Sequence, residues 1–66
     1  MGEFAGGLAH ELNQPLASII HDLDSAKFVL NEANFDRNEL VTIFQDVTAQ
    51  ANRAGDIIRA LSLIHI

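Results

Sequence analysis

The sequence predicts an all-α fold: an antiparallel hairpin of two helices that dimerises into a four-helix bundle. Two observations support the hairpin. Apolar residues recur at alternating intervals of four and three in both halves of the chain, and a stretch rich in Asn and Asp separates the halves. A third observation supports the dimer, because the second half carries an apolar stripe wider than one neighbouring helix needs. The 66 residues form a single domain, 1–66, and chains of this size often gain stability by association.

The first predicted helix covers about residues 2–31. Its apolar residues follow a heptad spacing, which is typical of a helix that packs along another helix; they are Leu12, Leu16, Ile19, Leu23, Ala26, Leu30 and Ala33. Phe4 and Ile20 widen this stripe. His10 falls roughly 160° from the centre of the stripe on a helical wheel, so we expect its side chain to face solvent.

A turn at about 32–36 and a second helix at about 37–64 follow. Asp36 and Glu39 resemble a capping box at the start of the second helix. This helix has two interleaved apolar seams, one at Leu40, Phe44, Val47, Ala51, Ala54, Ile58 and Leu61, the other at Ile43, Val47, Gln50, Ala54, Ile57, Leu61 and Ile64. A single hairpin would leave part of this surface in water, so we expect a symmetric pair of hairpins.

Composition excludes several classes of function. Nine acidic residues against four basic ones give a net charge of -5, which argues against binding to nucleic acid or to an anionic membrane surface. No apolar run is long enough to span a bilayer, and the absence of cysteine excludes disulfides. We expect a cytoplasmic segment without direct membrane contact, and the sequence leaves open whether a larger parent protein is anchored in the inner membrane.

The candidate site lies at residues 10–16, which read His-Glu-Leu-Asn-Gln-Pro-Leu. Glu11 could accept a proton from the His10 imidazole, fix its tautomer and leave the other ring nitrogen free as a nucleophile. Gln14 follows one helical turn later on the same face and could hold a water molecule there. Each of these residues also has a plain reading as a solvated side chain on a helix surface.

Pro15 is unusual inside a helix. It removes one backbone donor and clashes with the carbonyl of Glu11, so we expect a kink beside His10 and outside the packing face. One alternative is that Pro15 begins a helix capped by Asn13, with residues 2–12 forming a separate short helix. A zinc-protease reading fails, because His-Glu-x-x-His would need histidine where Gln14 stands, and the histidines have no other metal-ligand spacing.

Residues 1–19, with the His-Glu-Leu-Asn-Gln-Pro-Leu run, resemble the H-box of bacterial sensor histidine kinases, nearest the subgroup that includes dicarboxylate-sensing and oxygen-sensing kinases. The second half resembles the second helix of their dimerisation and histidine-phosphotransfer domain at Gln50, Arg53, Ala54, Ile57, Ile58, Arg59 and Leu61. The resemblance implies a homodimer that works with an ATP-binding domain of the same kinase and with the receiver domain of a response regulator.

The resemblance also implies a role for each residue of the site. His10 would be the phosphoacceptor, modified to phosphohistidine by attack on the γ-phosphate of ATP, and Glu11 would be its general base. Gln14 would orient the water that hydrolyses the phospho-aspartate of the regulator. Pro15 would supply a kink linked to switching, with Asn13 beside it as a structural residue.

The sequence departs from the family pattern at Gly6 and Gly7, at Gly55, in the tail at residues 62–66, which lacks the usual basic residues, and in the missing ATP-binding domain. Gly55 interrupts the second helix about level with Gln14 and Pro15, where we expect it to give room to the kinked first helix. The ATP-binding domain is absent, so ATP and Mg²⁺ would be bound elsewhere and this fragment is expected to be inactive alone. Two alternatives stay open: a non-enzymatic dimerisation scaffold, and a stand-alone phosphotransfer module fed by another kinase.

Overall fold

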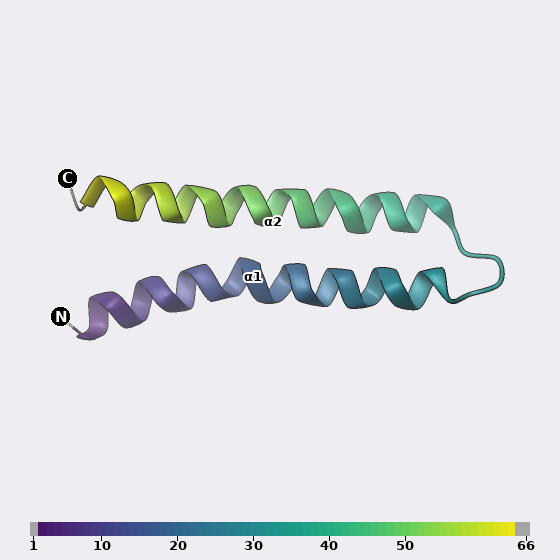
Figure 1. Cartoon of the computed structure of the whole chain (residues 1–66), viewed down its shortest axis with the longest axis horizontal. Helices are drawn as coiled ribbons and strands as arrows, with labels where there is room; N and C mark the ends of the chain where they lie inside the picture. Colours follow the sequence, from purple (N-terminus) through teal and green to yellow (C-terminus); the bar gives the residue numbers. More distant parts are fainter. Residues whose placement is uncertain (1, 65–66) are drawn as a thin grey trace.

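Two antiparallel helices make up the fold in the computed structural model, which describes the backbone of residues 2–64 and the side chains of residues 7–61. Helix α1 covers Gly2–Leu30 and helix α2 covers Arg37–Ile64. The connection joins the helices at one end of the hairpin, so the start of α1 and the end of α2 both lie at the other end (Figure 1). The predicted all-α hairpin is confirmed, and the described residues include no strand.

Asp36 begins α2 as the sequence predicts. Its carboxylate oxygen Oδ1 accepts a hydrogen bond of 2.9 Å from the backbone N–H of Asn38, which satisfies a donor that the first turn of a helix otherwise leaves free. The backbone carbonyl of Asp36 accepts the N–H groups of Glu39 and Leu40. The hydrogen bonds of the described residues thus include the aspartate half of the capping box, but not a return bond from the Glu39 side chain.

Backbone hydrogen bonds tighten the last turn of α1, and no residue in the left-handed conformation ends the helix. The N–H of Asn31 bonds the carbonyls of both Lys27 and Phe28, and the N–H of Glu32 bonds that of Val29. Hydrogen bonds that span three or four residues in this way satisfy the last carbonyls of a helix. No described residue has a positive φ, so the turn at 31–36 is built from ordinary backbone conformations.

The contact between the helices is narrow and made largely of small residues. The buried apolar side chains are Pro15, Ala26, Val29, Leu40 and Ala54, and Ile43 packs against Ala26, Val29 and Leu40 near the turn. A buried alanine contributes far less to stability than a buried leucine, because buried apolar area sets the hydrophobic gain. The contact between α1 and α2 is therefore a small core for a chain that is 48% apolar.

Only part of the heptad seam of α1 lies against α2, where Ala26 is buried and Leu12 and Ile19 are half-buried. Leu16, Leu23 and Leu30 are exposed, whereas Pro15 and Val29, one position before Leu16 and Leu30, are buried. Periodicity located the apolar side of the helix, but α2 packs about a quarter turn away from its centre. The exposed heptad residues Leu16, Leu23 and Leu30 are therefore open to a neighbour other than α2.

One seam of α2 faces α1 and the other stays largely open. Ile43, Val47, Gln50 and Ala54 are buried or half-buried, while Phe44, Ala51 and Ile58 are exposed. Exposed apolar residues of both helices therefore line one side of the hairpin, which we call the apolar stripe. It consists of Leu16, Ile20, Leu23, Leu30, Val41, Phe44 and Ile58. Phe4 and Ile64, which the periodicity adds to the apolar surface, lie outside the side chains that the structure describes.

The molecule is a single layer of helices. Its principal extents are 51 × 19 × 10 Å and its radius of gyration is 15.5 Å, whereas a compact domain of this length has about 11 Å. The smallest extent equals about one helix diameter, so none of the described residues covers the apolar stripe. Over residues 2–64, neither helix has an apolar stretch long enough to cross a membrane.

Pro15 lies in the packing face, which corrects the expectation that the kink stands outside it. Its side chain is fully buried between the helices. Helix α1 runs without a break through Pro15, so the alternative of a separate helix at residues 2–12 is not what the structure shows. The N-terminal part of α1 slopes away from α2 (Figure 1), as expected for a helix bent by an interior proline.

A polar layer interrupts the contact at mid-length. Asp22 of α1 is half-buried, and its Oδ2 atom, like Oε1 of Gln50 in α2, is buried without a hydrogen-bond donor. The Asp46 carboxyl raises the pKa of Asp22 above the usual value of 3.8, because the two groups can share a hydrogen-bonded proton. Partial burial and repulsion from Asp46 act in the same direction, and His21 opposes them.

Gly55 does not provide clearance for the bent helix. A Cβ atom added at Gly55 would meet no atom within 4 Å. The expectation that this glycine makes room for Pro15 and Gln14 is therefore wrong, and the residue lowers helix stability without a packing reason in the hairpin.

Candidate functional site

His10 stands on the surface of α1 with its side chain exposed. Gln14, four residues later, lies beside it because residues four apart share a helix face. Nε2 of Gln14 is 3.1 Å from Nε2 of His10. The structure therefore brings together two of the predicted site residues, the imidazole and the amide.

Arg53 of α2 completes the group from the other helix. Its Nη2 atom donates to Oε1 of Gln14 at 3.4 Å, and both side chains are exposed. The sequence pattern did not single out Arg53 as a site residue. The register of the hairpin could have done so, because residues equally far from the turn lie level with each other, and Gln14 and Arg53 are such a pair.

Glu11 and Asn13 are exposed on either side of this group. Among the described residues, no hydrogen bond or ion pair joins Glu11 to His10, as expected for neighbours whose side chains point about 100° apart on a helix. Pro15, the residue after Gln14, is buried. The site thus consists of an exposed row on α1, fixed to the hairpin by one buried proline and one bond to α2.

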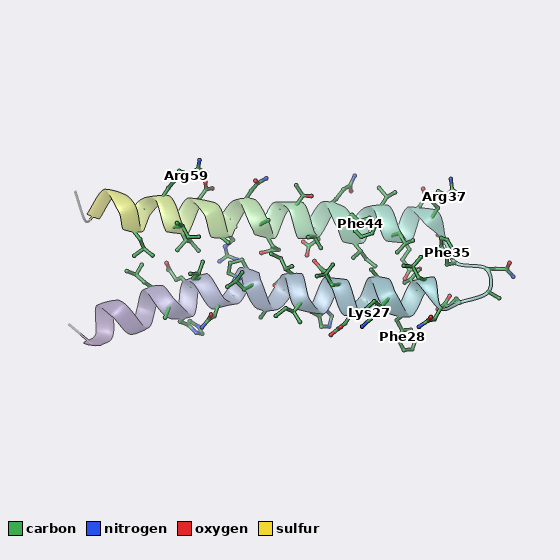
Figure 2. The ribbon with its side chains drawn as sticks, in the orientation of Figure 1. Lys27, Phe28, Phe35, Arg37, Phe44 and Arg59 are labelled. Atoms are coloured by element: carbon green, nitrogen blue, oxygen red, sulfur yellow. The ribbon has the colours of Figure 1, made fainter. Side chains whose placement is uncertain are left out.

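The two long sides of the hairpin differ in character. The helical wheel places His10 and Gln14 of α1, and Arg53 of α2, on the side away from the apolar stripe. Phe28, five turns after His10, lies on the same face as His10 and points away from α2 (Figure 2). A protein that covered the apolar stripe would therefore leave His10 accessible.

The remaining charges near the site are few. Arg59 pairs with Asp56 on the outside of α2, where it points away from α1 (Figure 2). Within the described part of the chain, no three His, Cys, Asp or Glu side chains come together in a way that could hold a metal ion. What the arrangement offers is an exposed imidazole, a ring nitrogen held by an amide, and one guanidinium nearby.

Comparison with known proteins finds curated relatives that match nearly the whole chain. Over 62 residues the chain is 45% identical to Sensor protein FixL of Bradyrhizobium diazoefficiens, covering 92% of this chain and 12% of that protein. It is 36% identical over 61 residues to the tetrathionate sensor histidine kinase TtrS of Salmonella typhimurium, covering 92% of this chain and 10% of that protein. It is 41% identical over 59 residues to the C4-dicarboxylate transport sensor protein DctS of Rhodobacter capsulatus, covering 89% of this chain and 9% of that protein.

No family model matches the chain, and no solved structure matches it significantly. The chain spans about a tenth of the length of the curated relatives. Nearly all of this chain takes part in each match, so the similarity covers both helices and the site at residues 10–16. Over nearly its whole length, this helical hairpin is therefore similar to one segment of sensor histidine kinases.

Proposed function

We propose that this chain is the phosphoacceptor segment of a two-component sensor histidine kinase. His10 takes the γ-phosphoryl group of ATP and then passes it to an aspartate in the receiver domain of a response regulator. The observation that carries this proposal is the position of His10, which is exposed on an unbroken helix, on the side away from the apolar stripe. Two partners in turn can approach an imidazole in that position.

The chemistry needs little from the protein beyond position. A ring nitrogen of His10 attacks the γ-phosphorus, the bond from that phosphorus to the bridging oxygen breaks, and ADP leaves. Glu11 takes the proton from the other ring nitrogen, after a side-chain rotation that its exposure allows. In the second step an aspartate oxygen of the regulator attacks the same phosphorus and the phosphorus–nitrogen bond breaks. Phosphoryl transfer of this kind depends mainly on alignment.

ATP and Mg²⁺ belong to a separate ATP-binding domain in this proposal, and the receiver domain is the second partner. Gln14 contributes to the reverse direction of signalling. Its amide holds a water molecule for attack on the phospho-aspartate of the regulator, which returns the regulator to its resting state. Pro15 and Asn13 shape the helix at this point, and the bend at Pro15 is the element that would move on switching.

A second copy of the chain covers the apolar stripe in this proposal. Two single-layer hairpins stacked through their stripes make a four-helix bundle, and an association of identical chains most often closes as a symmetric pair. The stripe has a hollow lined by Val41, Phe44, Gln45 and Thr48, which a side chain of the second copy can fill. His10 stays open on the other side of each hairpin.

Phosphoryl transfer from ATP tests the proposal. The 66-residue chain is mixed with a separately expressed ATP-binding domain of a similar histidine kinase and with radiolabelled ATP. The expected result is label that is labile in acid and stable in base, and that is lost in His10→Gln. His21→Gln is the matched control, because His21 is also exposed on α1. Equal labelling of wild type and His10→Gln would disprove the role of His10.

Gln14 has a separate readout in the same system. Gln14→Ala should reach the same final extent of labelling but remove phosphate from the regulator more slowly, by on the order of tenfold or more. Unchanged removal would eliminate the proposed role for Gln14.

A dimerisation scaffold without phosphoryl transfer is the second candidate, and the apolar stripe favours it because the stripe works without His10. A well-folded dimer that takes no label would support the scaffold. Label that arrives only from another phosphorylated protein, and never from ATP, would instead indicate a stand-alone phosphotransfer module.

A further inference from the structure

Arg53 has no part in the proposed function, yet it is the residue that ties the site to the second helix. Its guanidinium donates to Oε1 of Gln14 at 3.4 Å, and Nε2 of Gln14 lies 3.1 Å from Nε2 of His10. The three side chains form one line of two hydrogen bonds across the hairpin. All three are exposed, so the line can open when a partner arrives.

The donors and acceptors in this line determine where the imidazole proton sits. A guanidinium can only donate, so it selects the oxygen end of the Gln14 amide. The NH₂ end of that amide then faces His10, and it too can only donate. Nε2 of His10 must therefore accept, which requires its lone pair to be free of a proton. In a neutral imidazole the proton is then on Nδ1.

We propose that Arg53 is a positioning residue that fixes the tautomer of His10 through Gln14. Resting on the function proposed above, this makes Nε2 the ring nitrogen that reacts with the phosphoryl group and Nδ1 the one that gives its proton to Glu11. The amide of Gln14 covers the lone pair in the resting chain and leaves it when the phosphoryl group approaches. Without Arg53, the Gln14 amide is free to turn over, and the imidazole returns to the Nε2–H tautomer that neutral imidazoles of histidine favour in water.

Two features of the chain separate this role from simple charge or stability. Arg59 is a second exposed arginine of α2, bonded to Asp56 within its own helix, so Arg59→Met removes the same charge without touching the site. Methionine and arginine have similar helix propensities, so neither substitution should weaken α2. His21 reports on any general change, because it is a second exposed histidine on α1.

Nuclear magnetic resonance of the ¹⁵N-labelled chain tests the proposal. Long-range ¹H–¹⁵N correlations of the imidazole rings, recorded at about pH 8.5, where imidazoles are neutral, show which ring nitrogen carries the proton. Wild type should show His10 mainly as the Nδ1–H tautomer. Arg53→Met should shift the ratio towards Nε2–H by on the order of fivefold, the weight of one ordinary hydrogen bond.

The other variants complete the test. Arg59→Met should match wild type, Arg53→Lys should restore part of the Nδ1–H population because lysine is also a donor, and His21 should be the same in every sample. Far-ultraviolet circular dichroism checks that each variant remains helical. A wild-type His10 that is mainly Nε2–H, or an unchanged ratio in Arg53→Met, would overturn the role of Arg53.

This readout is independent of phosphorylation. If the tautomer shifts as expected but His10 takes no label from ATP, the proposed function fails and the role of Arg53 in positioning the imidazole stands. If His10 is labelled but its tautomer ignores Arg53, the reverse holds.

Discussion

At the scale of single residues, the least expected feature is the polar layer inside the hairpin. Asp22 occupies a position that the heptad pattern leaves unassigned, and it faces Asp46 and Gln50 across the contact. Two buried oxygen atoms there, Oδ2 of Asp22 and Oε1 of Gln50, lack a donor. A proton on Asp22 can be shared in a hydrogen bond with Asp46, which is the main physical reason that the pKa of the Asp22 carboxyl is raised.

Asp22→Asn should therefore stabilise the hairpin at neutral pH and change its pH dependence. Because its pKa is raised in the folded chain, Asp22 binds its proton more tightly there than in the unfolded chain. Its stabilising contribution is full below the usual value of 3.8 and is lost as the pH rises through the raised value. Asparagine carries a permanent donor in the same shape, so this contribution should not depend on pH in the variant.

Thermal unfolding followed by circular dichroism, at one chain concentration and over the weakly acidic to neutral range, measures this effect. Wild type should lose stability relative to Asp22→Asn as the pH rises. Asp24→Asn is the matched control, because Asp24 is exposed on the same helix. A variant that is less stable than wild type at neutral pH, or a control that behaves like Asp22→Asn, would contradict the prediction.

At the scale of helices, α2 contains a residue that weakens it. Gly55 lies in the interior of α2, where glycine is less favourable than alanine by roughly 0.5–1 kcal/mol. An added Cβ meets nothing within 4 Å. Gly55→Ala should therefore raise the free energy of unfolding by about that amount, measured by urea denaturation at fixed chain concentration.

Gly7→Ala provides the comparison for Gly55→Ala. Gly7 also has open space where the added methyl group would lie, but it is in the second turn of α1, where the helix end is less constrained, so its gain should be smaller. Lower stability of Gly55→Ala would mean that another chain packs closely against Gly55, since nothing in the hairpin does.

The sequence predicted the helices well because their signals are local. Asp36 caps α2 through a residue two positions away, and the apolar spacing within each half needs no knowledge of the other half. The faces that pack against each other were harder to predict, because periodicity locates the apolar side of a helix but not the neighbour that covers it. For this reason the heptad residue Leu23 is exposed while its neighbour Asp22 lies in the contact, and Pro15 is buried there although we expected it outside.

The site divides in the same way. His10 and Gln14 are one helical turn apart, so their proximity follows from spacing alone. Arg53 belongs to the other helix, and its bond to Gln14 depends on the register of the hairpin. A residue that meets the site only through tertiary structure leaves no mark in the local pattern.

At the scale of the whole molecule, the hairpin leaves many of its large apolar side chains exposed. The apolar stripe runs over both helices, and large continuous patches of this kind usually mark an interface. Phe44 lies within the stripe and is 51% exposed, whereas Phe28 lies outside it and is 75% exposed. If exposure alone decided which phenylalanine contributes to association, Phe28 would contribute more than Phe44.

In the proposed dimer that order is reversed, and the two phenylalanines form a matched pair for testing it. Phe44→Glu should raise the dimer dissociation constant at least about a hundredfold, because it removes a large apolar contact and would bury an unpaired charge. Phe28→Glu introduces the same charge on the face of α1 that carries His10, where no second hairpin packs, and it should leave dimerisation unchanged. Sedimentation equilibrium over micromolar concentrations measures both, with circular dichroism to show how much helix each variant keeps. Equal weakening by the two substitutions, or a wild-type chain that stays monomeric at high micromolar concentration, would mean that the apolar stripe does not hold a second copy.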